Sequence, residues 1–500
     1  MSKHVLTFAE YSHSINGKRN NASQNPSEPI THHDSFFFLV LLNTSTVFMN
    51  MESKVISSEY IEPSSPTPSH LRTYNLSMLD QVMEPVFIPI VLFFPPCSDN
   101  IVNDHADAFL QVTQQLKHSL SSILTRFYPL AGRANQYKHS IDCNDAGVHF
   151  IVARFSGHRL SDLLKKPDKD LSDQLFPRKV TWDSEMDPEC KILQIKVSYF
   201  DCGSVAIGAI FWHKVGDAAT MVNFLKAWGS TNRGSKEGVC PNYISQYLFP
   251  HKEELLEKHR PAQRILNEGK WTTKRYIFDS IAISSLKAKT GLENPTRVEA
   301  VSAFLWNCFM AASLKNGKST SAVAIAANLR GRAHPPFPSD CFGNFISITT
   351  ASSMNRTTGE YKDLARKFRD TIKKVDGEYV SRLQGDGGLL GLDAKMHSLF
   401  AEVPDGADLL TMSSWCRFGG YDIDFGWGKP LWMTAFFHGG SDSERSRYMN
   451  LVSLMDTRNG NGIEALVTLG ETHMPFFDAI EELHNLACIE PSPLHNMHSL

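Results

Sequence analysis

The segment Leu193–Trp228, "LQIKVSYFDCGSVAIGAIFWHKVGDAATMVNFLKAW", contains two strand patterns followed by a helix pattern. Apolar residues alternate with their neighbours over Leu193–Phe200, which predicts a half-buried strand. The turn "DCGS" then leads into the unbroken apolar run Val205–Trp212, which predicts the second strand of a hairpin, buried on both faces. The next apolar residues recur at helical spacing and predict an amphipathic helix packed on a core: Met221, Phe224, Leu225 and Trp228.

A histidine and an aspartate lie where the second strand gives way to the helix. A neutral imidazole at His213 can accept a proton from an alcohol or an amine, because its unperturbed pKa is about 6.5. Asp217 allows two interpretations: it orients the imidazole, or it caps the helix and pairs with an arginine. The spacing alone is weak support for catalysis, since it arises by chance in a chain with 20 histidines.

Composition excludes several classes of protein. The chain has 500 residues, of which 42% are hydrophobic and 21% charged, as in a folded protein of two or three domains. A net charge of -3 leaves no excess of Lys and Arg to neutralise phosphates, which argues against nucleic-acid binding. The nine cysteines are scattered and form no C-x-x-C pair, so we expect free thiols in the cytoplasm and no metal site.

Residues 1–50 fit neither a membrane span nor a signal peptide. Their apolar run, which starts at Ser35, is shorter than the 20 or so residues that a span needs. The run also begins late, follows the acidic Asp34 and lacks a small-residue cleavage site. We therefore expect a disordered or non-native extension at residues 1–50, with the folded protein opening at Met51.

Strand and helix patterns occur in both halves of the remaining chain. We predict strands at Val86–Phe94, Lys274–Ser280 and in a hairpin within Leu451–Leu469, and helices at Asp104–Phe127 and from Glu360 onward. Pro89 should mark a bulge or an edge of the first of these strands. Residues 230–272 show no sustained period, so we expect a long connection there. Sheet and helix in each half predict two α/β domains.

Two further segments are candidate sites. The first is "DIDFGWGKP" at Asp422–Pro430. Its glycines, Gly426 and Gly428, indicate a tight backbone path, and a purely structural turn is the simpler interpretation. In the Pro-rich loop Asn328–Phe345, Arg330 or Arg332 could pair with a carboxylate or contact a phosphate.

A third glycine-rich segment, "GDGGLLG" at Gly385–Gly391, resembles a dinucleotide-binding loop only superficially. Such a loop follows a strand, whereas this segment follows a predicted helix. We interpret it as a flexible loop.

Two motifs in this order and at this separation resemble the BAHD family of plant acyl-CoA-dependent acyltransferases: "HKVGD" at 213–217 and "DFGWG" at 424–428. The agreement covers nearly everything from Met51 onward, and residues 1–50 lie outside it. It extends to "PSSPTP" (63–68), "LSMLDQ" (76–81), "FYPLAGR" (127–133), "NLRGR" (328–332) and "FGN" (342–344). The chain looks most similar to the branch with vinorine synthase and the acylsugar acyltransferases.

The resemblance implies two chloramphenicol-acetyltransferase-like domains, each a mixed sheet with helices, joined by a long crossover. The N-terminal domain is then 51–229, the crossover 230–272 and the C-terminal domain 273–500. A channel between the domains holds His213 as the general base. Acyl-CoA serves as co-substrate for a small-molecule acceptor, and the implied protein is a cytoplasmic monomer with no bound cofactor and no metal.

The family's motifs also imply supporting roles. Asp217 and Asp424 are structural, and the partner of Asp424 is an arginine matching Arg330. Three residues of the second motif shape the channel: Gly426, Trp427 and Gly428. The chain departs from many members of the family at Trp212, which is bulkier than the usual residue and is expected to narrow the pocket or reshape the sheet beside it. A non-catalytic binding protein of the same fold is the alternative, and thioester hydrolysis is a third possibility.

Overall fold

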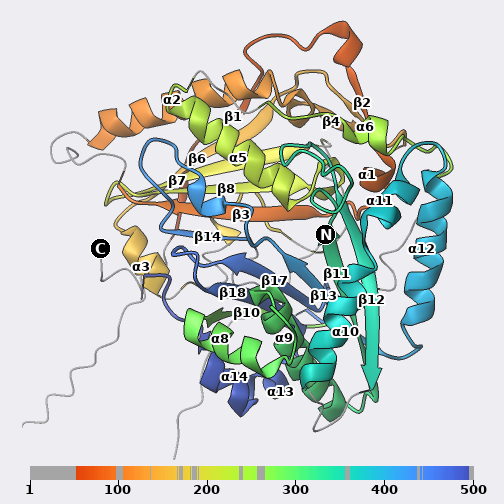
Figure 1. The fold of residues 1–500 in the computed structure, drawn as a ribbon. Helices are drawn as coiled ribbons and strands as arrows, with labels where there is room; N and C mark the ends of the chain where they lie inside the picture. The colour runs from red at the N-terminus through yellow and green to blue at the C-terminus, as the bar shows by residue number, and fades with distance from the viewer. Residues whose placement is uncertain are drawn as a thin grey trace, which may run out of the picture. The chain divides into compact units, whose positions relative to one another are not determined.

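Two mixed β-sheets, each covered by helices, form the framework of the protein (Figure 1). The computed structural model describes residues 52–494 except 97–104, 136, 166, 168–172, 181, 183–188, 190, 236–239, 256–264, 355–360, 436–439 and 442, and omits the side chains of 105–108 and 395–401. The expected extension at 1–50 lies outside the described residues. By its contacts, Met51–Leu500 is one compact unit.

The first sheet has the strand order β1-β6-β7-β8-β3-β14. Neighbouring strands are antiparallel except β6 and β7, which are parallel. The strands are β1 (Lys54–Ile61), β6 (Val148–Phe155), β7 (Leu193–Phe200), β8 (Val205–Trp212), β3 (Phe87–Phe94) and β14 (Trp432–Thr434). The last of these comes from the C-terminal part of the chain, so the first sheet is completed by a strand that the sequence analysis did not predict.

The predicted hairpin is confirmed in β7 and β8, but β7 is buried on both faces and not half-buried. It lies between β6 and β8, away from either edge of the sheet. Its alternate positions are polar and still buried: Gln194, Lys196 and Ser198. The amine of Lys196 donates to Ser53 Oγ at 3.4 Å. The alternation therefore reflects one apolar face and one polar face of β7, and both faces are buried.

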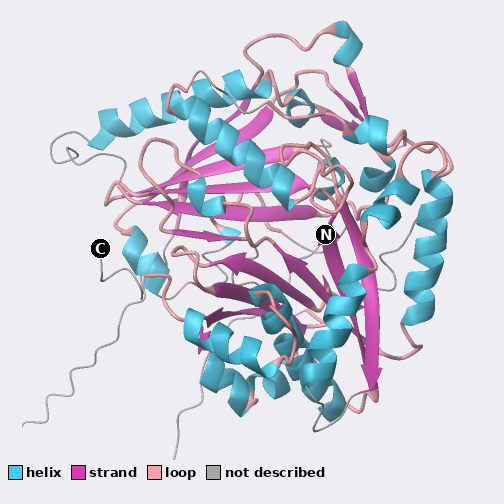
Figure 2. Cartoon of the chain, in the orientation of Figure 1, coloured by secondary structure: helices cyan, strands magenta, loops and turns pink. Residues whose placement is uncertain are grey.

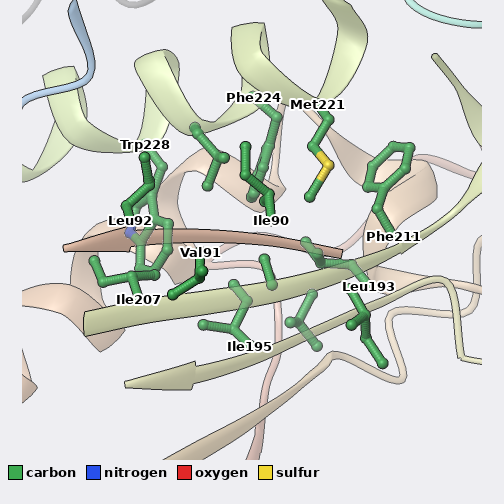
Figure 3. Close-up of a cluster of buried hydrophobic side chains, with 14 of the residues drawn as sticks. Ile90, Val91, Leu92, Leu193, Ile195, Ile207, Phe211, Met221, Phe224 and Trp228 are labelled. Carbon is green, nitrogen blue, oxygen red and sulfur yellow. The ribbon is translucent and has the colours of Figure 1, made fainter. Parts of the chain in front are cut away.

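Two long helices, α2 (His105–Leu124) and α5 (Ala218–Asn232), pack together over the first sheet (Figure 2). Both were predicted from apolar spacing. Figure 3 shows Met221, Phe224 and Trp228 extending from α5 toward the apolar side chains of β3 and β8. Trp228 also donates from Nε1 to Ser119 Oγ of α2 at 3.0 Å, so the two helices and the sheet share one core.

The second sheet has the order β12-β11-β13-β17-β18-β10-β15, with β19 also paired to β10. Its parallel pairs are β11 with β13 and β13 with β17. The strands are β10 (Trp271–Phe278), β11 (Thr320–Asn328), β12 (Ile346–Met354), β13 (Asp408–Ser414), β15 (Gly440–Ser441), β17 (Leu451–Asp456), β18 (Ile463–Gly470) and β19 (Cys488–Ile489).

Helix α9 (Arg297–Lys315) supplies most of the helical core under this sheet and contacts α8, α10 and α13 (Figure 1). The helices of the second half are α8 (Ser280–Lys289), α10 (Tyr361–Lys373), α11 (Gly377–Leu383), α12 (Gly388–Glu402), α13 (Met474–Asp478) and α14 (Glu481–Leu486). The short elements elsewhere are α1 (Met78–Gln81), α3 (Leu160–Lys165), α6 (Ser245–Leu248), β2 (Thr73–Asn75), β4 (Arg133–Asn135), β5 (Ser140–Asp142), β9 (Asn267–Glu268) and β16 (Arg447–Tyr448).

Most predicted elements of the second half are confirmed, and one is wrong. The hairpin β17–β18 turns through the predicted Asn-Gly-Asn-Gly segment, and β10 begins three residues before Lys274. The glycine-rich segment Gly385–Gly391 is not simply a loop, because α12 begins at Gly388. Pro89 lies in β3 opposite Ile210 of β8, in a register without a bulge, and the described residues of β14 pair with Val91–Phe93 on the other side of the strand.

Gly229 of α5 provides a test of how closely the chain's two halves approach each other. A Cβ atom there would lie 2.5 Å from the carbonyl oxygen of Asp424. We expect Gly229→Ala to lower the free energy of unfolding by about 1–3 kcal/mol through overpacking. Urea denaturation measures this. Gly387→Ala is the control, because a Cβ at Gly387 meets no described atom within 4 Å; equal effects in the two variants would contradict the close approach.

Candidate active site

A cavity of about 580 Å³ lies between the two sheets. Its wall on the first-sheet side includes Phe87 and Ile88 of β3 together with His213. Its wall on the second-sheet side comes from β11, β12, β13 and β17 and mixes apolar with polar side chains, although the surface of the cavity as a whole is largely apolar. The hydroxyl groups of this wall belong to Ser347, Thr350, Thr411, Ser413, Ser414 and Ser453. A cavity of this size and character suits a small organic molecule.

His213 opens the short 3₁₀ turn His213–Val215 that follows β8. Its backbone N–H donates to the carbonyl of Val86 at 2.9 Å, which fixes the turn against the start of β3. The side chain is half-buried, and the ring makes a hydrogen bond to the backbone of His213 itself. Burial lowers the pKa of the imidazole from its ordinary value, so the ring is neutral at pH 7. His213 is thus a candidate base that faces a largely apolar cavity.

Asp217 caps α5 and pairs with Arg330, as the second of the two interpretations predicts. The carboxylate accepts the N–H of Thr220 at 3.0 Å and receives Arg330 Nη1 at 2.7 Å and Nη2 at 3.1 Å. Burial raises the pKa of Asp217, but the guanidinium and the backbone donors outweigh it and hold the pKa below its usual range. Asp217 is therefore a buried, ionised carboxylate whose two oxygens both accept hydrogen bonds.

Arg330 is not the partner of Asp424, which corrects the expectation from the family motif. Arg233 Nη1 donates to the backbone carbonyl of Asp424 and lies 3.9 Å from Oδ2 of its carboxylate. The carboxylate itself accepts the N–H groups of Gly426 at 2.7 Å and Gly428 at 3.0 Å. Asp424 organises its own turn, whereas Arg330 leaves β11 beside the start of α5, within reach of Asp217.

The second motif lies outside the cavity wall. Gly426 and Gly428 have φ angles of 105° and 86°, which favour glycine and confirm the predicted tight path. Trp427 lies edge-on to Phe94 and stacks on Phe425. None of the residues 424–428 is among the described residues that line the cavity. The motif supports the core of the first sheet.

Trp212 also faces away from the cavity. It is 1% exposed and packs in the first core, and it is not among the described cavity-lining residues. Trp212 therefore does not narrow the pocket directly. Of the two arginines that could pair with a carboxylate or contact a phosphate, Arg330 meets the carboxylate of Asp217, whereas Arg332 Nη1 donates to the carbonyl of Val375 at 2.9 Å.

Two residues beside His213 were assigned no role from the sequence. Asp80 and Asn344 belong to "LSMLDQ" and "FGN", which served only as marks of the family. A capping box at Ser77–Asp80 was a readable signal for the position of Asp80, because Ser and an acidic residue three positions later form this motif. The contact between Asp80 and Asn344, 264 positions apart, had no signal in the sequence.

Among the described residues, no cluster of three His, Cys, Asp or Glu side chains is arranged to hold a metal ion. Nor does any helix in the described part of the chain reach the length and apolarity that crossing a membrane requires.

The two aspartates are expected to differ in their contribution to stability. Arg330→Met leaves Asp217 buried and uncompensated, which should cost about 3–5 kcal/mol. Asp424→Ala removes a partly exposed acceptor of two N–H groups and should cost about 1–2 kcal/mol. Urea unfolding of the two variants measures both values. An Asp424→Ala variant as unstable as Arg330→Met would contradict the assignment of the ion pair.

Comparisons with known proteins agree with this architecture. Residues 51–484 match the model of the Transferase family. Stemmadenine O-acetyltransferase of Catharanthus roseus is 36% identical over 85% of this chain and 96% of its own length, and limonoid 1-O-acetyltransferase of Citrus sinensis is 34% identical over 88% of this chain and 100% of its own.

Structures show the same fold. The crystal structure of vinorine synthase superposes with a TM-score of 0.73 at 33% identity, covering 87% of this chain and 98% of that one. The fold also matches Fusarium graminearum TRI101 complexed with coenzyme A and T-2 mycotoxin, with a TM-score of 0.63 at 15% identity, covering 84% of this chain and 99% of that one. The chain therefore belongs to the Transferase family, the BAHD acyltransferases that its two motifs resemble, and is an acyl-CoA-dependent O-acyltransferase.

Proposed function

We propose that the protein transfers an acetyl or another short acyl group from acyl-CoA to a hydroxyl of a plant specialised metabolite, with His213 as the general base. The observation that carries this proposal is the half-buried imidazole of His213, with its lowered pKa, on the wall of a largely apolar cavity. A base that is neutral at pH 7 and shielded from water can take a proton from an alcohol.

The reaction needs one proton acceptor and no external oxidant or reductant. His213 takes the proton of the acceptor hydroxyl as its oxygen attacks the thioester carbonyl. The tetrahedral intermediate collapses, the carbon–sulfur bond breaks, and the thiolate of CoA leaves with the proton from the imidazolium. Asp217 does not take part in these transfers, because the contacts with Arg330 and Thr220 already occupy its carboxylate.

The acceptor is proposed from the cavity wall and the relatives. The cavity surface is largely apolar, and its second-sheet wall adds a row of hydroxyl groups, which suits a bulky and largely apolar molecule that carries polar groups such as a hydroxyl. The relatives are named for O-acetylation of stemmadenine and of a limonoid, which supports acetyl as the first donor to test. We place the enzyme in the cytoplasm as a monomer with no bound cofactor, and we propose the domains 51–229 and 273–500 with the crossover 230–272.

Replacement of the proposed base should abolish most of the turnover without unfolding the protein. We expect His213→Ala to lower kcat by about 100- to 10,000-fold, the usual contribution of a general base. Release of free CoA from acetyl-CoA, measured over a panel of alcohols, gives the rates. His118→Ala is the control, because His118 is an exposed residue of α2. Near-normal turnover in His213→Ala would refute the mechanism.

The pH dependence should follow the lowered pKa of His213. Protonation removes the base, and a pKa below the ordinary value means that protonation occurs at lower pH. The acid limb of kcat/KM should therefore lie below about pH 6.5, the unperturbed value for histidine. A profile of kcat/KM between pH 5 and 9 measures it. An acid limb above that value would show that burial does not control the base.

A further inference from the structure

The hydroxyl groups on the second-sheet wall of the cavity differ in whether another group of the protein already binds them. Ser347 Oγ and the hydroxyl of Tyr379 lie 2.5 Å apart and share a hydrogen bond. Thr350 Oγ1 donates to Glu402 Oε2 at 3.0 Å. Ser414 Oγ accepts a backbone N–H at 3.4 Å. These three hydroxyls serve the structure of the wall itself.

Ser453 differs from them. It is 1% exposed, and its Oγ has no hydrogen-bond partner among the described residues. Ser198 and Thr434 are buried hydroxyls of the same kind, but neither is among the described residues that line the cavity. Ser453 thus combines an unpaired, buried hydroxyl with a place on the cavity wall.

The strand β17 explains why Ser453 faces the cavity. Its neighbours Val452 and Leu454 belong to the core on the other side of the second sheet. Successive side chains of a strand point to opposite faces, so Ser453 points toward the first sheet, where it lines the cavity. In the parallel register Ser413 of β13 pairs with Ser453 and lines the same wall. The free hydroxyl therefore lies in a small polar patch within a largely apolar surface.

The position of this patch relative to His213 indicates which molecule can reach it. His213 belongs to the first-sheet wall of the cavity and Ser453 to the second-sheet wall. An acceptor that presents its reacting hydroxyl to His213 therefore has another part of its surface toward Ser453. An apolar surface there would enclose the serine hydroxyl without a partner, which is costly, whereas an oxygen atom would pair with it.

We propose that Ser453 selects the acceptor by donating a hydrogen bond to a second oxygen atom of it, distinct from the hydroxyl that receives the acyl group. The inference rests on the proposed function of the cavity. It narrows the acceptor to a bulky alcohol with a keto, ester, ether or second hydroxyl oxygen remote from the reacting group. Ser453 is a specificity residue and takes no part in the proton transfers.

The amides of acetyl-CoA are a second source of oxygen atoms in the cavity. A contact between Ser453 and CoA would raise the KM for acetyl-CoA in Ser453→Ala whichever alcohol is used. A contact with the acceptor instead changes the preference between alcohols and leaves the KM for acetyl-CoA as it is. The two sources therefore give different kinetic results.

The test compares pairs of alcohols that share one rigid skeleton, in the assay for released CoA. One pair is androstanol and epiandrosterone, which has an added keto group at the end remote from the hydroxyl; a second pair replaces epiandrosterone by androstanediol. We expect the wild type to prefer the oxygenated member in kcat/KM. Ser453→Ala should lower this preference by about 3- to 10-fold, the contribution of one neutral hydrogen bond. The ratio does not depend on the folded fraction, because both alcohols meet the same preparation.

The matched control is Ser198→Ala. This variant also loses a buried, unpaired strand hydroxyl, but from β7 and outside the described lining of the cavity, so its preference ratio should equal that of the wild type. An unchanged ratio in Ser453→Ala overturns the proposal, and so does a raised KM for acetyl-CoA with an unchanged ratio. Absence of CoA release with every alcohol would overturn the proposed function itself, whereas release without preference overturns the role of Ser453 alone.

Discussion

The ion pair between Arg330 and Asp217 holds the two halves of the protein together at the active site. Asp217 follows the first sheet and Arg330 follows a strand of the second, and their side chains are 5% and 6% exposed. Removing charges from water is costly, so such a pair lasts only where further hydrogen bonds satisfy it. Arg330 also donates to the carbonyl of Cys341, and Asp217 also accepts from Phe345, so the pair sets the loop that carries Asn344.

Local patterns in the sequence were sufficient for the elements around the site. Strict runs and alternations of apolar residues predicted β7, β8 and α5, because each pattern matches one backbone period. Those three elements place His213 and Asp217 at the joint where the sequence analysis placed them. The exposure of a strand was harder to predict. Apolar and polar residues alternate in β7, as in a strand with one face in water, and yet both of its faces are buried.

Pairing across long distances was not readable in the same way. Asp217 and Asp424 are both aspartates within two positions of a glycine, and nothing in the sequence says which of them Arg330 meets. In the structure Arg330 bonds to Asp217, while the carboxylate of Asp424 accepts from Gly426 in its own turn. Trp212 was expected near the pocket because it precedes His213, but the change from strand to 3₁₀ turn sends the two side chains to different surroundings. Three-dimensional placement, not residue type, decided both cases.

The strand β14 has a consequence for how the chain is synthesised. Trp432–Thr434 completes the first sheet by pairing with Val91–Phe93, more than 300 positions earlier. When domains fold as they leave the ribosome, the N-terminal strands emerge first, and this edge of β3 then lacks its partner until most of the polypeptide has been translated. An uncovered strand edge can pair with other chains. The edge of β3 at Val91–Phe93 is therefore the part of the first sheet that stays open longest during synthesis, until β14 arrives.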